Sequence, residues 1–165
     1  TVWKMTEVRI EDLLKSFNKV LDELPETIEN AIYKNEKEII KLQRNQIYDG
    51  QNNKGEDLRP LYTEDSYFKT EGQARGYIKW KQQITPNPRR NPNAPNLYIN
   101  GYIHRNIIIV KEGGEIILDI NSRIGFGEDL KGKYKDILEL NPTNQWYIKN
   151  ERIIPELWEL LSKHI

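Results

Sequence analysis

The sequence predicts an α+β fold formed by a single domain over residues 1–165. Apolar residues recur at helical spacing near the start of the chain and again at its end. Between these stretches, two β-prone runs flank Glu112-Gly113-Gly114, a pattern typical of a hairpin. We therefore expect long N-terminal helices, a long irregular loop, a central antiparallel β-hairpin and a C-terminal helix.

The N-terminal part predicts two helices separated by a proline. Residues 7–24 carry apolar side chains on one helical face, and a second periodic stretch runs from 26 to about 48. Pro25 is expected to interrupt the first helix, because proline cannot donate the backbone hydrogen bond. Gly50 is expected to end the second helix, since glycine adopts the left-handed conformation common after helix C-termini.

Residues 50–96 predict an extended loop or arm region. The stretch is rich in Asn, Gly and Asp, could hold a short helix or two, and has four prolines in residues 85–95. Long segments with so little core-forming pattern are usually functional or ordered against a partner. We expect residues 86–95 to be an arm that Leu97, Tyr98 and Ile99 fix to the domain, with Gly101 allowing a sharp turn into the next strand.

The C-terminal half predicts the hairpin and a final helix. The strands are expected at residues 107–111 and 115–120, and consecutive apolar residues predict that both faces of the hairpin need cover. A short helical turn is expected near residues 134–140, stopped by Asn141-Pro142. Residues 151–164 predict the last helix.

The charges of the whole chain cancel, with 25 basic and 25 acidic residues, but they are unevenly distributed. Residues 59–105 carry 8 basic and 3 acidic side chains and lie between two acidic segments. Internal complementarity and a functional basic surface both explain this pattern. The absence of cysteine excludes disulfides and zinc–thiolate sites within this sequence, and the chain has no apolar run of about 20 residues, so we expect no membrane contact.

The sequence does not predict an enzyme. His104 and His164 are the only histidines, and we expect His104 to be structural. Glu64 and Asp65 form an acidic pair, but adjacent side chains point in different directions and a solvated turn explains them better. The sequence has no phosphate-binding, dinucleotide-binding or nucleophile motif and no metal-ligand spacing, so no catalytic residue, metal or cofactor is expected.

A basic and aromatic segment predicts a partner interface. Cationic and aromatic side chains alternate here, and the expected interface residues are Lys79, Trp80, Lys81, Arg89, Arg90, Tyr98 and Tyr102. Such residues can bind nucleic acid through phosphate contacts and base stacking. They are also the residues that dominate protein–protein contacts, and the zero net charge favours a protein partner.

A spaced motif in the middle of the chain resembles a known family. It reads Gly50-x4-Gly55-x4-Pro60-x-Tyr62, followed by the basic and aromatic segment and then by "NLYINGYIHRNIII". In this last run Leu97 and Gly101 occupy characteristic places, with Asn100 and Asn106 where threonine and serine are usual. The pattern, over roughly residues 28–120, is similar to the phage virion-morphogenesis and tail-completion family, small proteins of the head–tail connector or neck.

The resemblance implies a structural subunit of a head–tail connector or tail-completion ring around the DNA channel. It implies no catalysis and no cofactor, and it implies a place in the virion after assembly in the cytoplasm of a bacterial host. The implied partners are copies of the chain itself, portal or connector proteins and tail proteins, with non-specific contact with double-stranded DNA left open. The alternative is a nucleic-acid-binding accessory protein that uses the basic and aromatic surface of residues 75–105.

Overall fold

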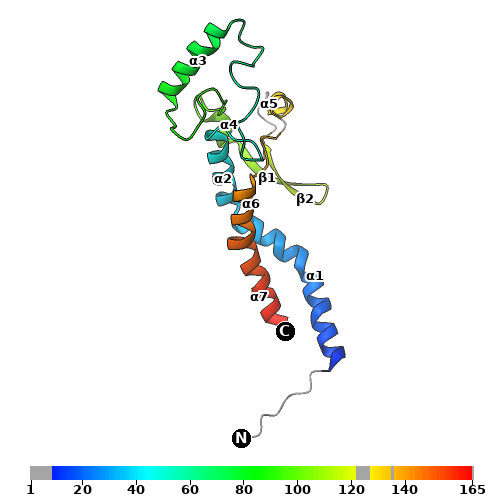
Figure 1. The fold of residues 1–165 in the computed structure, drawn as a ribbon. Coiled ribbons are helices and arrows are strands. Elements are labelled where there is room, and N and C mark those ends of the chain that lie inside the picture. The colour runs from blue at the N-terminus through cyan, green and yellow to red at the C-terminus, as the bar shows by residue number, and fades with distance from the viewer. Residues whose placement is uncertain (1–8, 122–126, 135, 165) are drawn as a thin grey trace. The chain divides into compact units, whose positions relative to one another are not determined.

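The computed structural model describes residues 9–121, 127–134 and 136–164. It confirms the α+β class, with helices near both ends of the chain and a two-stranded antiparallel sheet in the middle (Figure 1). Where a single domain was expected, the chain groups into two compact units. The helical unit comprises residues 1–35 and 147–165, and the central unit comprises Glu36–Trp146.

Helix α1 of the helical unit spans Ile10–Lys34 and includes Pro25, so the predicted interruption at this proline is wrong. A proline inside a helix removes one hydrogen bond and costs about 3 kcal/mol, which the rest of a 25-residue helix can offset. The helix ends instead at Asn35, whose side-chain amide donates to the carbonyl of Ala31 at 2.8 Å. Asparagine competes for backbone groups in this way and so favours helix ends.

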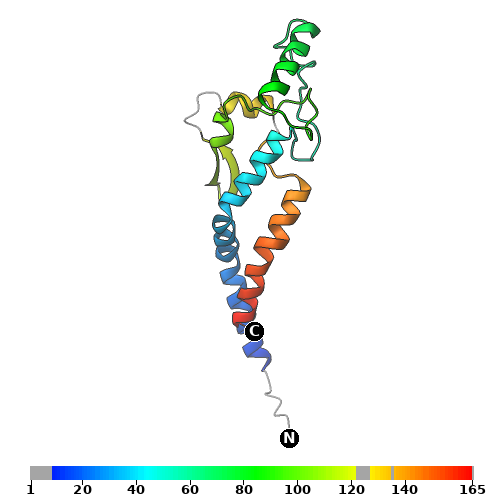
Figure 2. The ribbon, with the colours of Figure 1, turned by 90° about the vertical axis from the view of Figure 1, so that its left-hand side faces the viewer.

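Helix α7 (Ile154–His164) packs antiparallel against α1. Lys34, at the end of α1, bonds to Glu156 near the start of α7, and His164 Nε2 lies 3.1 Å from Glu23 Oε2 at the other end. Two views show that α1 begins beyond the C-terminal end of α7 (Figures 1 and 2). The first turns of α1 therefore extend past the partner helix.

The C-terminal helical run is longer than predicted. Helix α6 (Pro142–Ile148) and a π-helical segment (Lys149–Ile153) precede α7. Asn141 Oδ1 accepts a hydrogen bond from the Asn144 amide at 3.0 Å, and Pro142 takes the first helical position, where no backbone donor is needed. The expected turn at residues 134–140 is not helical where it is described, and helix α5 (Gly127–Lys133) precedes it instead.

The central unit contains helices α2 (Glu36–Tyr48), α3 (Glu71–Ile84) and α4 (Tyr102–Arg105) and strands β1 (Ile107–Glu112) and β2 (Glu115–Ile120). The predicted hairpin is confirmed, with Ile107 opposite Ile120 and Glu112 opposite Glu115. Gly113 and Gly114 both have positive φ, as a two-residue hairpin turn requires. Helix α2 contacts β1, while α4 supplies a helical turn directly before the strand.

The core of the central unit joins segments that are distant in the sequence. Its buried members are Ile47, Leu58, Ile107, Tyr134 and Ile137, and Leu97 and Leu118 are among the partly buried residues packed against them. These residues come from α2, the following loop, β1 and the stretch after α5. Residues 50–96 thus contribute to the core through Leu58.

Two buried glutamines of α2 bind the backbone after α5. Gln43 Nε2 donates to the carbonyl of Ile137 at 2.6 Å, and Gln46 Nε2 donates to that of Glu139 at 2.8 Å. Gln46 Oε1 also accepts from the amide of Asn141 at 2.7 Å. Because buried backbone groups need partners, these side chains fix residues 137–141 to α2 without a strand or helix there.

Candidate functional site

The proline-rich loop of residues 86–96 differs from the expected arm, because it packs onto the end of α2. Asn87 Nδ2 donates to Asp49 Oδ1 at 2.7 Å and to the carbonyl of Tyr48 at 3.2 Å. Asn91 Nδ2 donates to Asp57 Oδ2 at 2.6 Å. Ala94, Pro95 and Asn96 are buried. The loop is therefore part of the interior of the central unit.

The seven expected interface residues divide into exposed and buried groups. Lys79, Trp80, Arg89 and Tyr102 are exposed, and Tyr98 is half-buried. Lys81 and Arg90 are 1% and 4% exposed, so these two cations lie inside the unit and not on its surface. The expected surface keeps its aromatic residues and loses two of its charges.

The position of Lys81 follows from the periodicity of α3. Ala74, Ile78, Lys81 and Thr85 recur at spacings of three and four residues, and this face is turned inward. Lys79 and Trp80 lie on the opposite, exposed face. A helical reading of residues 71–84 would have placed Lys81 inside, but the glycines at 72 and 76 obscured the helix.

Arg90 is held by the loop that contains it. Its Nη1 donates to the carbonyl of Ala94 at 2.5 Å, and its Cγ lies 3.1 Å from the position that a Cβ on Gly50 would take. Gly50 has a φ of +72° and ends α2, as predicted. Arg89, by contrast, reaches Asp49 Oδ1 at 3.1 Å with most of its side chain in solvent.

The other motif residues have structural positions. Gly55 (φ +79°) lies in a turn, Pro60 is half-buried and Tyr62 is buried. Leu97 has a φ of +49°. Gly101 (φ +75°) was expected to turn the chain into a strand, but it precedes helix α4 and β1 begins only at Ile107. A Cβ on Gly101 would lie 3.0 Å from the Tyr98 ring. Only glycine fits Gly101 without strain.

Aromatic rings cluster between α3 and the loop before it. The Tyr62 and Tyr77 rings lie 5.0 Å apart edge-on, and Phe68 lies 5.2 Å from Tyr77. Tyr77 also lies 5.2 Å from Trp80, which carries the cluster to the surface. An edge-to-face pair such as Tyr62 and Tyr77 stabilises the cluster beyond the burial of its rings.

A pocket of about 670 Å³ opens beside this cluster, and we call it the aromatic pocket. Its walls come from α3, α4, α5 and the loops around them, and they are mostly apolar or aromatic. The lining includes Tyr62, Asp65, Tyr67, Phe68, Tyr77, Lys81, Pro95, Leu97, Tyr98, Ile99, Asn100, Tyr102, Ile103, Leu130, Lys133 and Tyr134. A second, more open pocket of about 530 Å³ lies between Tyr67, Lys69 and Trp80.

The ionisable groups of the aromatic pocket have shifted pKa values. Burial, together with repulsion by Arg90, lowers the pKa of Lys81 to about 8. Burial raises the pKa of Tyr134 to about 12 and also raises that of Tyr62, so both remain neutral phenols. Burial opposes ionisation of Asp65, but hydrogen bonds from Lys133 and the Tyr67 amide lower its pKa overall.

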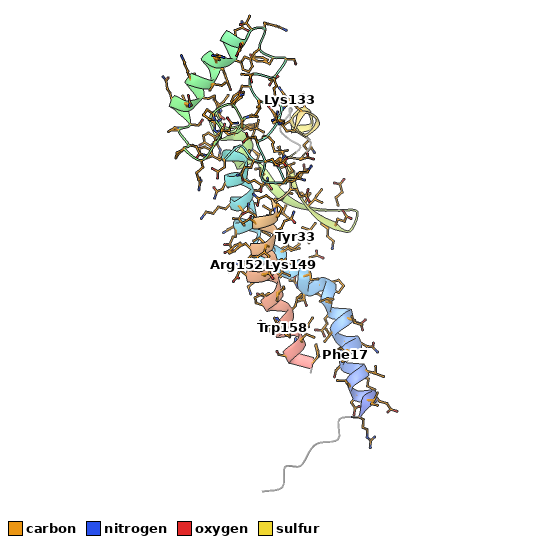
Figure 3. All side chains as sticks on the ribbon, viewed as in Figure 1. Phe17, Tyr33, Lys133, Lys149, Arg152 and Trp158 are labelled. Carbon is orange, nitrogen blue, oxygen red and sulfur yellow. The ribbon has the colours of Figure 1, made fainter. Side chains whose placement is uncertain are left out.

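Lys133 projects from α5, where Figure 3 labels it, and its Nζ lies 2.6 Å from Asp65 Oδ2. The neighbouring Glu64 accepts from Arg59 and from the Leu61 amide, so the adjacent carboxylates have separate partners. No group of three or more potential metal ligands occurs in the described part of the chain. His104 is buried, lies 2.9 Å through Nε2 from the Asn96 carbonyl, and has a pKa lowered by burial.

The helical unit exposes an apolar face. The sequence predicted that α1 has such a face, but not that it would be exposed. Ile10, Leu14, Phe17 and Leu21 are 76%, 56%, 45% and 62% exposed. On α7, Trp158 is 64% exposed, and Figure 3 shows it and Phe17 on the two helices of this unit. We call the α1 residues the exposed stripe. An apolar surface of this length on a helix is a usual mark of a contact site.

None of the helices in the described ranges is both long and apolar enough to span a membrane. Comparison with known proteins adds no relative: no family model, no curated protein and no solved structure matches this chain.

Proposed function

We propose that this chain is a structural subunit of a bacteriophage head–tail connector or tail-completion ring, joining neighbouring virion proteins around the DNA channel. The observation that carries the proposal is the exposed stripe of α1, which offers Ile10, Leu14, Phe17 and Leu21 to a partner. The resemblance in residues 28–120 supplies the class of assembly. We expect the subunit to act by contact, without catalysis or a cofactor.

The pattern of α1 supports an apolar partner. Apolar residues fall at 10, 13, 14, 17, 20, 21 and 24, which is the spacing of a wide helical face. Charged residues fall at 11, 12, 15, 19, 22, 23 and 26, on the opposite face. Helix α7 pairs with α1 from Glu23 to Lys34, so the stripe precedes the part of α1 that these ion pairs hold.

The chain itself is the first partner to consider. A face that is apolar in one copy is apolar in every copy, so two stripes can meet across a two-fold axis or take part in a ring contact. Burying one leucine fully contributes roughly 1.5–3 kcal/mol, so a few such residues suffice for a specific helical contact. Portal, connector or tail proteins are the further partners in this proposal.

The competing function, nucleic-acid binding by residues 75–105, loses support from the burial of Lys81 and Arg90. Two further arginines of the region are paired, Arg75 with Glu71 at 2.6 Å and Arg89 with Asp49 at 3.1 Å. Each phosphate contact needs an available cation. We therefore expect the attraction to DNA to be weaker and less salt-dependent than it would be if all these cations were exposed and unpaired.

Native mass spectrometry over a concentration series tests the proposal, repeated with a short DNA duplex at two salt concentrations. We expect a closed oligomer without DNA. Leu14→Glu and Leu21→Glu should each dissociate it, because a carboxylate would be buried in an apolar contact. Lys19→Glu is the control, since it places the same side chain on the exposed charged face of the same helix, away from the stripe.

The outcomes separate the two functions. Oligomers that survive Leu14→Glu and Leu21→Glu as well as Lys19→Glu would show that the stripe is not the contact. A monomer that binds the duplex and releases it steeply as salt rises would replace the connector proposal by the nucleic-acid-binding one.

A further inference from the structure

Lys81 is a buried cation, and no buried anion lies against it among the residues that the structure describes. Its side chain lines the aromatic pocket, and its Nζ donates a hydrogen bond to the carbonyl of Tyr98. A backbone carbonyl satisfies one of the three N–H donors of an ammonium group. The nearby charge that acts on Lys81 is Arg90, and it is repulsive.

Buried charges in proteins are normally paired, because transfer of an ion out of water is costly. The acidic side chain in the pocket lining is Asp65, and its Oδ2 is bound by Lys133 at 2.6 Å. Within the described ranges, the lining therefore holds two lysines and one aspartate, and the unbalanced charge lies with Lys81. An anion that enters the pocket would remove this imbalance.

The rest of the pocket favours an apolar ligand body. Its volume of about 670 Å³ falls within the range of roughly 300–1,000 Å³ usual for small-molecule sites. Leu97, Ile103 and Leu130 give it aliphatic wall, and Tyr77 and Tyr134 give it ring faces and edges. A few polar groups in an otherwise apolar cavity fix the orientation of a ligand.

From this geometry we propose that the aromatic pocket binds a small organic carboxylate with an aromatic or aliphatic body, whose anionic group pairs with the Lys81 ammonium. The body would lie against Tyr77, Tyr134 and Leu97. This inference does not depend on the proposed connector function, since it concerns a cavity within one central unit.

The affinity for such an anion should depend on pH. Lys81 must be protonated to bind it, and its pKa of about 8 places the loss of charge just above neutrality. The charged groups described around it are Arg90 and the Asp65–Lys133 pair across the pocket, and the titratable groups include His104, Tyr62, Tyr77 and Tyr134. His104, whose pKa is lowered by burial, and the three tyrosines, whose pKa values are raised by burial, are neutral in this range. Binding should therefore weaken as pH rises through about 8.

Three matched probes test the proposal by isothermal titration calorimetry: 4-phenylbutyrate, 4-phenylbutanol and 4-phenylbutylamine. They share the apolar body and differ in the charge of the end group. At neutral pH we expect the carboxylate to bind about tenfold more tightly than the alcohol, the usual gain from one charge-assisted hydrogen bond, and the amine to bind most weakly. Equal affinity for carboxylate and alcohol, or no binding of 4-phenylbutyrate at millimolar concentration, would overturn the proposal.

Variants locate the anion contact. Lys81→Gln keeps an N–H donor but removes the charge, so it should erase the preference for the carboxylate while leaving the alcohol unaffected. Lys79→Gln is the matched control, because Lys79 is exposed on the same helix two residues away. If the two variants weaken carboxylate binding equally, the attraction is a general surface effect and the pocket assignment fails.

One further variant avoids the risk that Lys81→Gln shifts the loop whose Tyr98 carbonyl Lys81 binds. Ile99 lines the pocket and is 61% exposed, so Ile99→Trp should fold normally and obstruct the cavity with Lys81 unchanged. We expect Ile99→Trp to weaken binding of both the carboxylate and the alcohol at least tenfold. Undiminished binding in this variant would place the ligand elsewhere and refute the site.

Discussion

The two units of this chain use similar apolar helices in opposite ways. In the central unit, α2 buries Ile39 and Ile47 and its glutamines Gln43 and Gln46. In the helical unit, α1 is almost twice as long but has only Val20 and Ala31 buried. Helical periodicity therefore shows which face of a helix is apolar, and not whether the chain itself covers that face. The uncovered face is where contact with another molecule is expected.

The largest expected effect on stability comes from a comparison of Ile137→Ala in the central unit with Leu21→Ala in the helical unit. Ile137 is 1% exposed in the central core, so its truncation should lower the free energy of unfolding by about 2–5 kcal/mol. Leu21 is 62% exposed, so its truncation should change the free energy of unfolding of the dilute monomer by less than about 0.5 kcal/mol. Urea denaturation measures both values.

Sedimentation at high protein concentration completes this comparison by measuring self-association. Leu21→Ala should weaken self-association. Ile137→Ala should leave it unchanged under conditions in which that variant is folded. A large loss of monomer stability in Leu21→Ala would mean that the stripe is covered within one chain.

The second prediction concerns adjacent arginines with different surroundings. Arg90→Ala removes a buried donor to the Ala94 carbonyl and leaves a void beside Gly50, so we expect a loss of about 2–3 kcal/mol in unfolding free energy. Arg89→Ala breaks an exposed pair with Asp49 and should cost less than about 1 kcal/mol. Deletion of residues 86–95 should unfold the central unit. Equal effects of the two substitutions would restore the arm interpretation.

Local signals predicted the elements that depend on neighbouring residues. The hairpin was correct because Gly113 and Gly114 fall between two β-prone runs, and the end of α2 was correct because Gly50 follows an apolar periodic stretch. The error at Pro25 has a physical reason: one proline sets a local cost, while the persistence of α1 depends on the whole helix and on α7.

The candidate site was less accessible from the sequence. Lys79 and Lys81 look alike in the sequence, and only the register of α3 separates the exposed residue from the buried one. The aromatic pocket joins Tyr62, Lys81, Leu97 and Lys133, which no local pattern links. Such a cavity depends on contacts between distant segments. The sequence therefore showed which aromatic residues are present, but not that they line one cavity.

The third prediction uses the titration of Lys81. Its pKa is about 8 in the folded unit, against an ordinary value of 10.5. Between these two pH values the unfolded chain binds more protons than the folded chain, so the free energy of unfolding rises with pH. Relative to Lys81→Met, the native protein should gain stability between pH 8 and about 9.5, by at most about 1.4 kcal/mol per pH unit. Denaturation of both proteins over this range measures the difference. A constant difference would mean that Lys81 titrates normally in the folded state.

The smallest predicted effects come from substitutions at exposed helix positions, and they should be alike in the two units. Equal effects would show that the two units differ in burial and not in helix propensity. Gly76 of α3 is exposed, and a Cβ there meets nothing within 4 Å, so Gly76→Ala should stabilise by about 0.5–1 kcal/mol. Asn18 of α1 is also exposed, and Asn18→Ala should stabilise by roughly 0.5 kcal/mol. Both gains come from backbone propensity, which requires no core. Thermal unfolding followed by circular dichroism measures them. A gain at Gly76 with none at Asn18 would show that the first half of α1 becomes a stable helix only when its stripe is covered by a partner.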